Sequence, residues 1–377
     1  KSGIRNVERS QKSRVKTQNP KFFPQDGNNS MKLMHPGLKE FLSIDQYIPN
    51  RKIGFLSIET PLPEFFKKLT ESIPNYTIAL NIRREYRHLA TALRAFKLKD
   101  VDTIFLFEIY LQHVFITLFL LALTGKEVLL CLHGEQQFAD KNPIKYAGLL
   151  YLKLFLKLFK FKIVLFEIDD EILPEKVRIP SASKIIIPHP IRSDVEPTSP
   201  LGNRKPDNEP IKIGIVGMIR ADKPIFELAQ RLATYTKRPD SGCEFIIGLP
   251  FHQKSEKIEQ LEVQLYDTAQ ESEYFSLLQK LDILVAFYKG DRYYYRASGV
   301  VNDAVSCGCY ILASDYPVIK HQLISPVEVG KTFQNFDELE ARISEAIPHI
   351  RSQGKDNQWL WREGRTAEAI AKQLFRA

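Results

Sequence analysis

Short apolar runs alternate with amphipathic segments along the chain from residue 51 onward. Runs that are apolar at nearly every position are typical of strands buried on both faces of a sheet, and the intervening segments of covering helices. The pattern therefore predicts an α/β protein built on parallel sheets. In the first half of the chain, the predicted strands are residues 53–58, 76–80, 103–107, 128–132, 162–166 and 184–187.

The predicted helices of the first half are residues 63–72, 85–96, 109–123 and 146–161. The segment 109–123 is the most apolar, and Lys126 and Glu127 close it two residues later. A membrane-spanning helix needs about 20 apolar residues. We therefore interpret this segment as a buried helix of a globular domain.

The alternation stops between residues 192 and 210, where four prolines, Gly202 and mixed charges predict a linker. It then resumes, and the segments predicted after the linker are strands 211–216, 244–247, 283–286 and 310–313 and helices 225–235, 273–280 and 299–306.

The sequence thus predicts two doubly wound, Rossmann-like domains that face each other across a cleft. Residues 46–191 form the first domain and 211–350 the second, with a closing helix, 359–375, in the segment 351–377. Ligands of such sheets bind at the carboxyl ends of the strands.

Composition supports two folded cores, because 44% of the residues are hydrophobic and 26% are charged. The net charge of +8 comes largely from residues 1–30, which hold seven Lys or Arg against Glu8 and Asp26. We therefore expect residues 1–45 to form a disordered basic tail, and we expect no nucleic-acid partner. If nucleic acid did bind, deleting residues 1–30 should abolish the binding.

Four cysteines, Cys131, Cys243, Cys307 and Cys309, lie in or beside predicted core elements. They lack the paired C-x-x-C halves of a zinc site. A reducing, cytoplasmic compartment is expected, without a structural metal.

Two segments of the second half suggest chemistry. Gly217 ends the predicted strand 211–216, and Arg220 and Lys223 follow before the next helix. A glycine at a strand end permits close approach of an anion, and a forked and a mobile cation suit a diphosphate. Basic residues in such a loop are also common as solvent-facing side chains, so this signal alone leaves both interpretations open.

The second segment is 293–304, in which Ser298 is a good N-cap and Gly299 permits a phosphate to approach the first turn of a helix. Asp303 lies further along this helix, where its carboxylate can accept hydrogen bonds from ribose hydroxyls. A capped core helix with an exposed aspartate is the alternative.

The ordered combination of motifs in residues 53–343 resembles family 4 of the glycosyltransferases, which have the GT-B architecture. It is most similar to the subset whose donor-binding helix begins with Ser-Gly. Residues 284–288, 298–308 and 311–315 resemble the donor half of that family. Residues 219–224 are similar to its IRPYKG loop, 187–191 to its IPHP segment and 130–135 to its TLHG strand end.

The resemblance implies that Arg220 and Lys223 neutralise the diphosphate of a nucleotide-sugar donor. This diphosphate is the leaving group, and its departure from the sugar is the catalytic step. Ser298 and Gly299 would bind the same phosphates, and Asp303 the ribose. Tyr295 occupies the position of the family's first, sugar-contacting glutamate. Met218 also stands where many members have arginine, and Pro224 replaces the usual glycine.

On the acceptor side, the resemblance makes His133 a candidate catalytic residue and Glu135 a candidate substrate-binding residue. It also implies retention of anomeric configuration, no metal and no cofactor apart from the donor substrate. The closing helix would pack back on the first domain. The expected activity is sugar transfer to a glycan or lipid-linked acceptor in polysaccharide or glycoconjugate synthesis. A nucleotide-sugar epimerase and a non-catalytic nucleotide- or glycan-binding subunit are the alternatives.

The helix 146–161 combines leucine and aromatic residues with Lys153, Lys157 and Lys160, which cluster within roughly 60° of its circumference. Such a helix suits an anionic bilayer surface, and it equally suits a core helix with one lysine stripe. The resemblance favours the first interpretation, because members of that family often glycosylate lipid-linked acceptors, and implies a cytoplasmic protein that contacts the inner face of the membrane.

Overall fold

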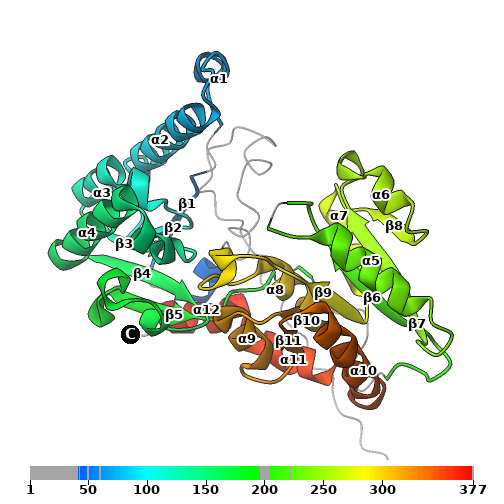
Figure 1. The fold of residues 1–377 in the computed structure, drawn as a ribbon. Coiled ribbons are helices and arrows are strands. Elements are labelled where there is room, and N and C mark those ends of the chain that lie inside the picture. The colour runs from blue at the N-terminus through cyan, green and yellow to red at the C-terminus, as the bar shows by residue number, and fades with distance from the viewer. Residues whose placement is uncertain are drawn as a thin grey trace, which may run out of the picture.

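A computed structural model describes residues 41, 43–48, 51–58, 61–192, 194–195, 204–220 and 222–375. It contains two parallel β-sheets, each with its own helices, in the two halves of the chain (Figure 1). The predicted α/β class with two Rossmann-like domains is thereby confirmed.

The first sheet has the strand order β1-β2-β3-β4-β5, so that consecutive strands are neighbours and every pairing is parallel. Its strands are β1 (Ile53–Leu56), β2 (Thr103–Leu106), β3 (Glu127–Cys131), β4 (Phe161–Phe166) and β5 (Lys184–Ile187). The helices between them are α1 (Glu64–Glu71), α2 (Tyr76–Ala95), α3 (Val114–Leu123) and α4 (Pro143–Leu158).

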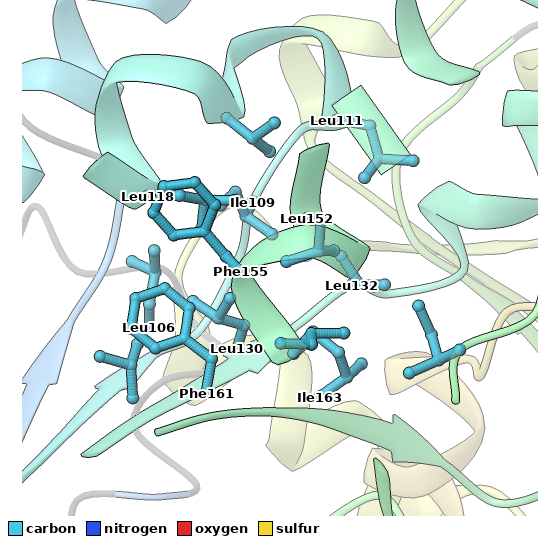
Figure 2. Close-up of a cluster of buried hydrophobic side chains, with 14 of the residues drawn as sticks. Leu106, Ile109, Leu111, Leu118, Leu130, Leu132, Leu152, Phe155, Phe161 and Ile163 are labelled. Carbon is cyan, nitrogen blue, oxygen red and sulfur yellow. The ribbon is translucent and has the colours of Figure 1, made fainter. Parts of the chain in front are cut away.

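Helices α2, α3 and α4 share one face of this sheet, as expected when the strand order does not reverse. Leu118 of α3 and Leu152 of α4 meet Leu106 and Leu130 of the strands in one buried cluster (Figure 2). Each of these four side chains is fully buried. The apolar segment predicted as a buried helix therefore contributes to the core of the first domain.

The opposite face of the first sheet is covered by segments from far away in the sequence. Phe105 and Val164 point to this face and pack against Ile370 of α12 (Ala367–Leu374). Phe41 and Ile44, which were predicted in the disordered tail, are fully buried in the same cluster. That prediction is wrong at these two residues, because their side chains pack against a sheet face that would otherwise be less covered. Residues 1–40 lie outside the described residues.

The second sheet has the order β11-β10-β9-β6-β7-β8 and is also parallel throughout. Its strands are β6 (Ile211–Val216), β7 (Cys243–Leu249), β8 (Gln264–Asp267), β9 (Ile283–Ala286), β10 (Tyr310–Ser314) and β11 (Gly330–Phe333). The order reverses between β6 and β9, which creates a crevice at the carboxyl ends of these two strands.

Helices cover both faces of the second sheet. On one face α5 (Ile225–Thr236) and α10 (Phe336–Gln353) pack on the strands, and on the other α7 (Glu271–Lys280), α8 (Gly299–Ser306) and α9 (Pro317–Ile324) do so. The remaining helices are α6 (Glu256–Glu259) and α11 (Asp356–Glu363).

Two predicted elements are wrong. Residues 76–80 are not a strand but the first turns of α2, because the Asn75 side chain accepts a hydrogen bond from Ile78 N–H and starts the helix there. The single closing helix 359–375 is divided into α11 and α12, since the Thr366 side chain caps a new helix. The edge strands β8 and β11 were not anticipated, because their short sequences lack a long apolar run.

A buried ion pair joins the end of the first sheet to the C-terminal helices. The guanidinium of Arg365 donates to both carboxylate oxygens of Glu167, at 2.5 and 2.8 Å. Glu167 follows β4 with a φ of 72°, a left-handed conformation that side chains rarely adopt. Arg365 also donates to the His189 carbonyl, just before the linker.

The ion pair keeps Glu167 charged in the interior. Burial alone would raise the pKa of this carboxyl, but Arg365 and hydrogen bonds from His321 and from the His189 N–H lower that pKa to about 2. The indole ring of Trp361 lies 3.9 Å from the Arg365 guanidinium carbon. Among the described residues, no helix is long and apolar enough to span a bilayer.

Removing one partner of this ion pair should destabilise the protein strongly, because the other charge would stay buried and unpaired. For Arg365→Met we expect a loss of about 3–5 kcal/mol, seen as a melting temperature roughly 10 °C lower. The double variant Glu167→Gln/Arg365→Met should recover part of this loss. The control is Lys372→Ala, which breaks an exposed pair on helix α12, just after Arg365 in the chain. Equal melting temperatures for Arg365→Met and Lys372→Ala would contradict the expectation.

Candidate functional site

The reversal of strand order in the second sheet brings together the two loops that contain most of the predicted site residues. Gly217 directly follows β6 with a φ of 123°, which favours glycine. A Cβ atom there would lie 3.4 Å from Lys223 Nζ. The second loop runs from the end of β9 to Ser298, the N-cap of α8. A hydrogen bond from Lys289 N–H to the Asp222 carbonyl, at 2.9 Å, joins the loops.

The two predicted cations lie on the first loop and point to tyrosines of the second. Arg220 Nη2 donates to the Tyr293 hydroxyl at 2.8 Å. The ammonium of Lys223 lies 5.4 Å from the centre of the Tyr288 ring. The rings of Tyr288 and Tyr293 stack with their centres 3.9 Å apart. The tyrosine pair thus holds both cations beside each other.

Burial changes the acidity of one of these cations. Desolvation of the ammonium, with repulsion from Arg220, lowers the pKa of Lys223 to about 8, although Asp222 opposes this. Asp222 lies 3.3 Å from Arg220 Nε. A half-buried ammonium next to a guanidinium is an arrangement that an anion would stabilise.

Tyr288 also connects the cations to the start of α8. Its hydroxyl is hydrogen-bonded to Ser298 Oγ at 2.7 Å. Ser298 Oγ accepts from Val301 N–H, as predicted for an N-cap. A Cβ atom on Gly299 would meet nothing within 4 Å, so there is open space in front of this helix N-terminus. Gly217, Arg220, Lys223, Ser298 and Gly299 are therefore brought together.

Asp303 lies further along α8, against α7. Its carboxylate accepts a hydrogen bond from the Tyr274 hydroxyl at 2.9 Å. Burial raises the pKa of Asp303 to about 7; Tyr274 and Arg192 oppose the shift, and Glu271 adds to it. The carboxyl group thus changes charge near neutral pH.

The first-domain candidates meet the second domain at the end of β3. His133 Nε2 is hydrogen-bonded to the Phe107 carbonyl at 2.9 Å, and its φ is 46°. A Cβ atom on the following Gly134 would lie only 1.9 Å from the carbonyl oxygen of Tyr295. Glu135 is buried and forms an ion pair of 2.7 Å with Lys145.

The Tyr295 side chain is not brought together with Arg220, Lys223 and Ser298, and its backbone instead lies against Gly134 of the first domain. Its side chain is buried among first-domain residues, and its hydroxyl donates to the Ile168 carbonyl at 3.0 Å. Its N–H donates to Gln137 Oε1 at 3.0 Å. Tyr295 therefore connects the two domains in this structure.

Several residues of the site were missed from sequence. Tyr288 was part of a motif, but its ring between Lys223 and Ser298 can be known only from the packing of two loops. Asn302 donates to the His189 ring and carbonyl, at 2.6 and 2.8 Å, and so fixes α8 to the segment before the linker. The only available signal was its place beside Asp303 in the predicted helix.

Metal-binding groups do not gather in the described part of the chain, where no cluster of three or more His, Cys, Asp or Glu residues could hold an ion. The four cysteines are free thiols. Burial raises the pKa of Cys309 to about 12 and of Cys243 to about 11.

The sequence matches no protein-family model and no curated protein. Solved structures match the fold. The chain is similar to sucrose-phosphate synthase from Thermosynechococcus elongatus, with a TM-score of 0.55 and 16% identity over 84% of this chain and 79% of that one. It is similar to HepE from Anabaena, solved in complex with UDP-glucose, with a TM-score of 0.55 and 14% identity over 90% and 95% of the two chains.

A glycosyltransferase from Rickettsia africae is also similar, with a TM-score of 0.57 and 14% identity over 90% of this chain and 92% of that one. At these identities the likeness shows the fold. The predicted GT-B architecture is confirmed by it.

The raised pKa of Asp303 predicts a stability effect that depends on pH. Between about pH 4 and 7 this carboxyl is protonated in the folded protein and ionised in the unfolded chain, so its contribution to stability falls as the pH rises. We expect Asp303→Asn to raise the melting temperature by a few degrees at pH 8 and by less at pH 5. Asp337→Asn, at an exposed position, is the control. A gain that is equal at both pH values would refute the effect.

Proposed function

We propose that this chain is a glycosyltransferase that moves a sugar from a nucleoside-diphosphate donor to a glycan or lipid-linked acceptor. The observation that carries the proposal is the convergence of Arg220 and Lys223 with the open N-terminus of α8 at the reversal of strand order. Crevices of this kind bind nucleotides in open α/β sheets.

The donor diphosphate would lie between the two cations and α8. The guanidinium of Arg220 offers a forked donor, Lys223 a point charge, and the first turn of α8 its N–H groups. Asp303, when ionised, would accept hydrogen bonds from the ribose. Because HepE was solved with UDP-glucose, uridine nucleotides are the first donors to test.

We propose transfer with retention and without a metal. The bond between C1 of the sugar and the diphosphate oxygen breaks, and the acceptor oxygen bonds to C1 on the same face. The acceptor hydroxyl gives its proton to the departing phosphate oxygen. Arg220 and Lys223 stabilise the charge that develops on the leaving group.

His133 is proposed to contact the donor sugar from the first domain. Its strained backbone at the end of β3 supports this role, since such strain is concentrated at functional sites. The buried side chain of Tyr295 favours sugar recognition by other residues. Glu135, paired with Lys145, is proposed to act on the acceptor side.

A non-catalytic nucleotide-binding subunit is the second candidate. It is favoured by Tyr295, which occupies the position of a sugar-contacting glutamate and packs into the first domain. A nucleotide-sugar epimerase is the remaining alternative. Release of UDP from UDP-glucose that depends on an added acceptor distinguishes the transferase from both, because neither alternative consumes an acceptor.

We further propose that the protein works in the cytoplasm at the inner face of a membrane, in polysaccharide or glycoconjugate synthesis. Exposed apolar side chains of α3 and α4 support this. Those more than a third exposed are Phe115, Ile116, Phe119, Leu123, Ile144, Leu150, Leu154 and Leu158. Lys157 and Lys160 are exposed nearby, whereas Lys153 donates to the Lys176 carbonyl. An anionic bilayer suits this combination.

Binding of UDP should stabilise the wild-type protein and not Lys223→Ala. A ligand at about a hundred times its dissociation constant adds about 2.7 kcal/mol, which is visible as a higher melting temperature. GDP and ADP serve as competing nucleotides in the same measurement. The matched control is Lys289→Ala, which removes an exposed lysine of the second loop that pairs with Glu227.

Lys223→Arg extends this test to pH, because the wild-type ammonium loses its proton above about pH 8 and arginine does not. Stabilisation by UDP-glucose should decline above pH 8 in the wild type and persist in Lys223→Arg. Absence of a shift for every nucleotide would reject the donor site. A shift without UDP release in the presence of acceptors would favour the binding subunit.

Sedimentation with anionic vesicles tests the membrane proposal. We expect wild-type protein to sediment with vesicles that contain phosphatidylglycerol, and Phe119→Glu and Leu154→Glu to remain in the supernatant. Ile324→Glu, which changes an equally exposed apolar side chain of the second domain, is the control. The membrane proposal would be refuted if all the variants sedimented with the vesicles, or if the wild-type protein itself did not.

A further inference from the structure

A second polar cavity, of about 230 Å³, lies between the two domains. From the first domain it is lined by residues of α2, α4 and the segments between them, and from the second by Arg292 and Arg296. Lys223, Ser298 and Gly217 do not line it. The cavity is therefore distinct from the proposed diphosphate site.

Positive charge dominates this cavity. Its lining includes Arg84, Lys145, Arg292 and Arg296, and a single carboxylate, that of Glu135. Glu135 is already paired with Lys145 at 2.7 Å. The carboxylate of Glu135 thus balances the charge of Lys145. The three guanidinium groups, which come from both domains, add further positive charge to the cavity.

Two of these guanidinium groups lack a carboxylate partner in the part of the chain that the structure describes. Arg84 is half-buried and lies 4.8 Å from the centre of the Tyr110 ring. Arg296 is also half-buried. The third, Arg292, is more exposed and forms an ion pair of 3.6 Å with Asp222. Partly desolvated like charges destabilise one another, and a bound anion would relieve this.

The cavity is next to the donor site on its first-domain side. Arg292 and Arg296 belong to the same loop as Tyr293 and Ser298. Tyr293 contacts Arg220 of the proposed diphosphate site, and Ser298 caps α8. Glu135 follows His133 at the end of β3. A group in this cavity would therefore lie where an acceptor reaches the donor sugar.

We propose that this cavity binds a phosphate or diphosphate group of the acceptor. That the bound group belongs to an acceptor rests on the proposed function, whereas the binding of an anion does not. Three guanidinium groups match the two or three negative charges of such a group, and their forked N–H donors match its oxygens. A ligand with a single carboxylate group would leave part of the positive charge of the cavity unbalanced.

Inorganic pyrophosphate is the probe, titrated calorimetrically into the full chain with the donor site saturated by UDP. Wild type should bind it, and Arg84→Gln and Arg296→Gln should each weaken binding about tenfold or more. Arg84→Lys, which keeps the charge, should weaken it less. The control is Arg94→Gln, an exposed arginine of α2 outside the cavity. Melting temperatures verify that the variants fold.

Unchanged binding in Arg84→Gln and Arg296→Gln, or no binding to wild type, would overturn the proposal. Failure of UDP to bind would instead refute the donor site. The titration would then be repeated without UDP on Lys223→Ala, where dependence on Arg84 still supports an anion site. Displacement of pyrophosphate by farnesyl diphosphate at lower concentration than by glucose 6-phosphate indicates a lipid-linked acceptor, and the reverse order a soluble sugar phosphate.

Discussion

The carboxylate of Glu167 and the guanidinium of Arg365 meet at the junction of the two domains, where neither is exposed to water. Each is stable there because the other is present and because His189 and Ser325 supply further hydrogen bonds. The pair attaches the C-terminal helices to the end of β4. As a result α12 covers a sheet face that the helices between the first strands do not reach.

The same junction fixes the helix on which the proposed donor site depends. Asn302 of α8 is bonded to His189, and Gln322 donates to Asn302 Oδ1 at 2.8 Å and accepts from Ser298 N–H at 2.9 Å. The N-terminus of α8 is therefore positioned by the junction as well as by its own sheet. Tyr295, inserted in the first domain, gives the preceding loop a second fixed point.

Both proposed sites hold charges in unfavourable surroundings. Burial lowers the pKa of Lys223 and raises that of Asp303, and the cavity beside Glu135 concentrates arginines. Residues that served only the fold would be expected to find partners within it. At Lys223 and at the arginines of the cavity, a bound anion would supply opposite charge that the fold supplies only in part, which supports ligand binding at both sites.

The sequence by itself determined the class of fold, because apolar periodicity reflects burial directly: β6, β9 and α8 begin and end where the pattern predicts. It also identified Arg220 and Lys223 in the loop after a strand end, and Ser298 as the N-cap of α8. Only the tertiary structure decided that Phe41 and α12 cover the first sheet, that the Tyr295 side chain packs into the first domain, and that Arg84 and Arg296 line one cavity. These contacts join residues far apart in the chain, and local patterns contain no information about which distant surface a side chain will meet.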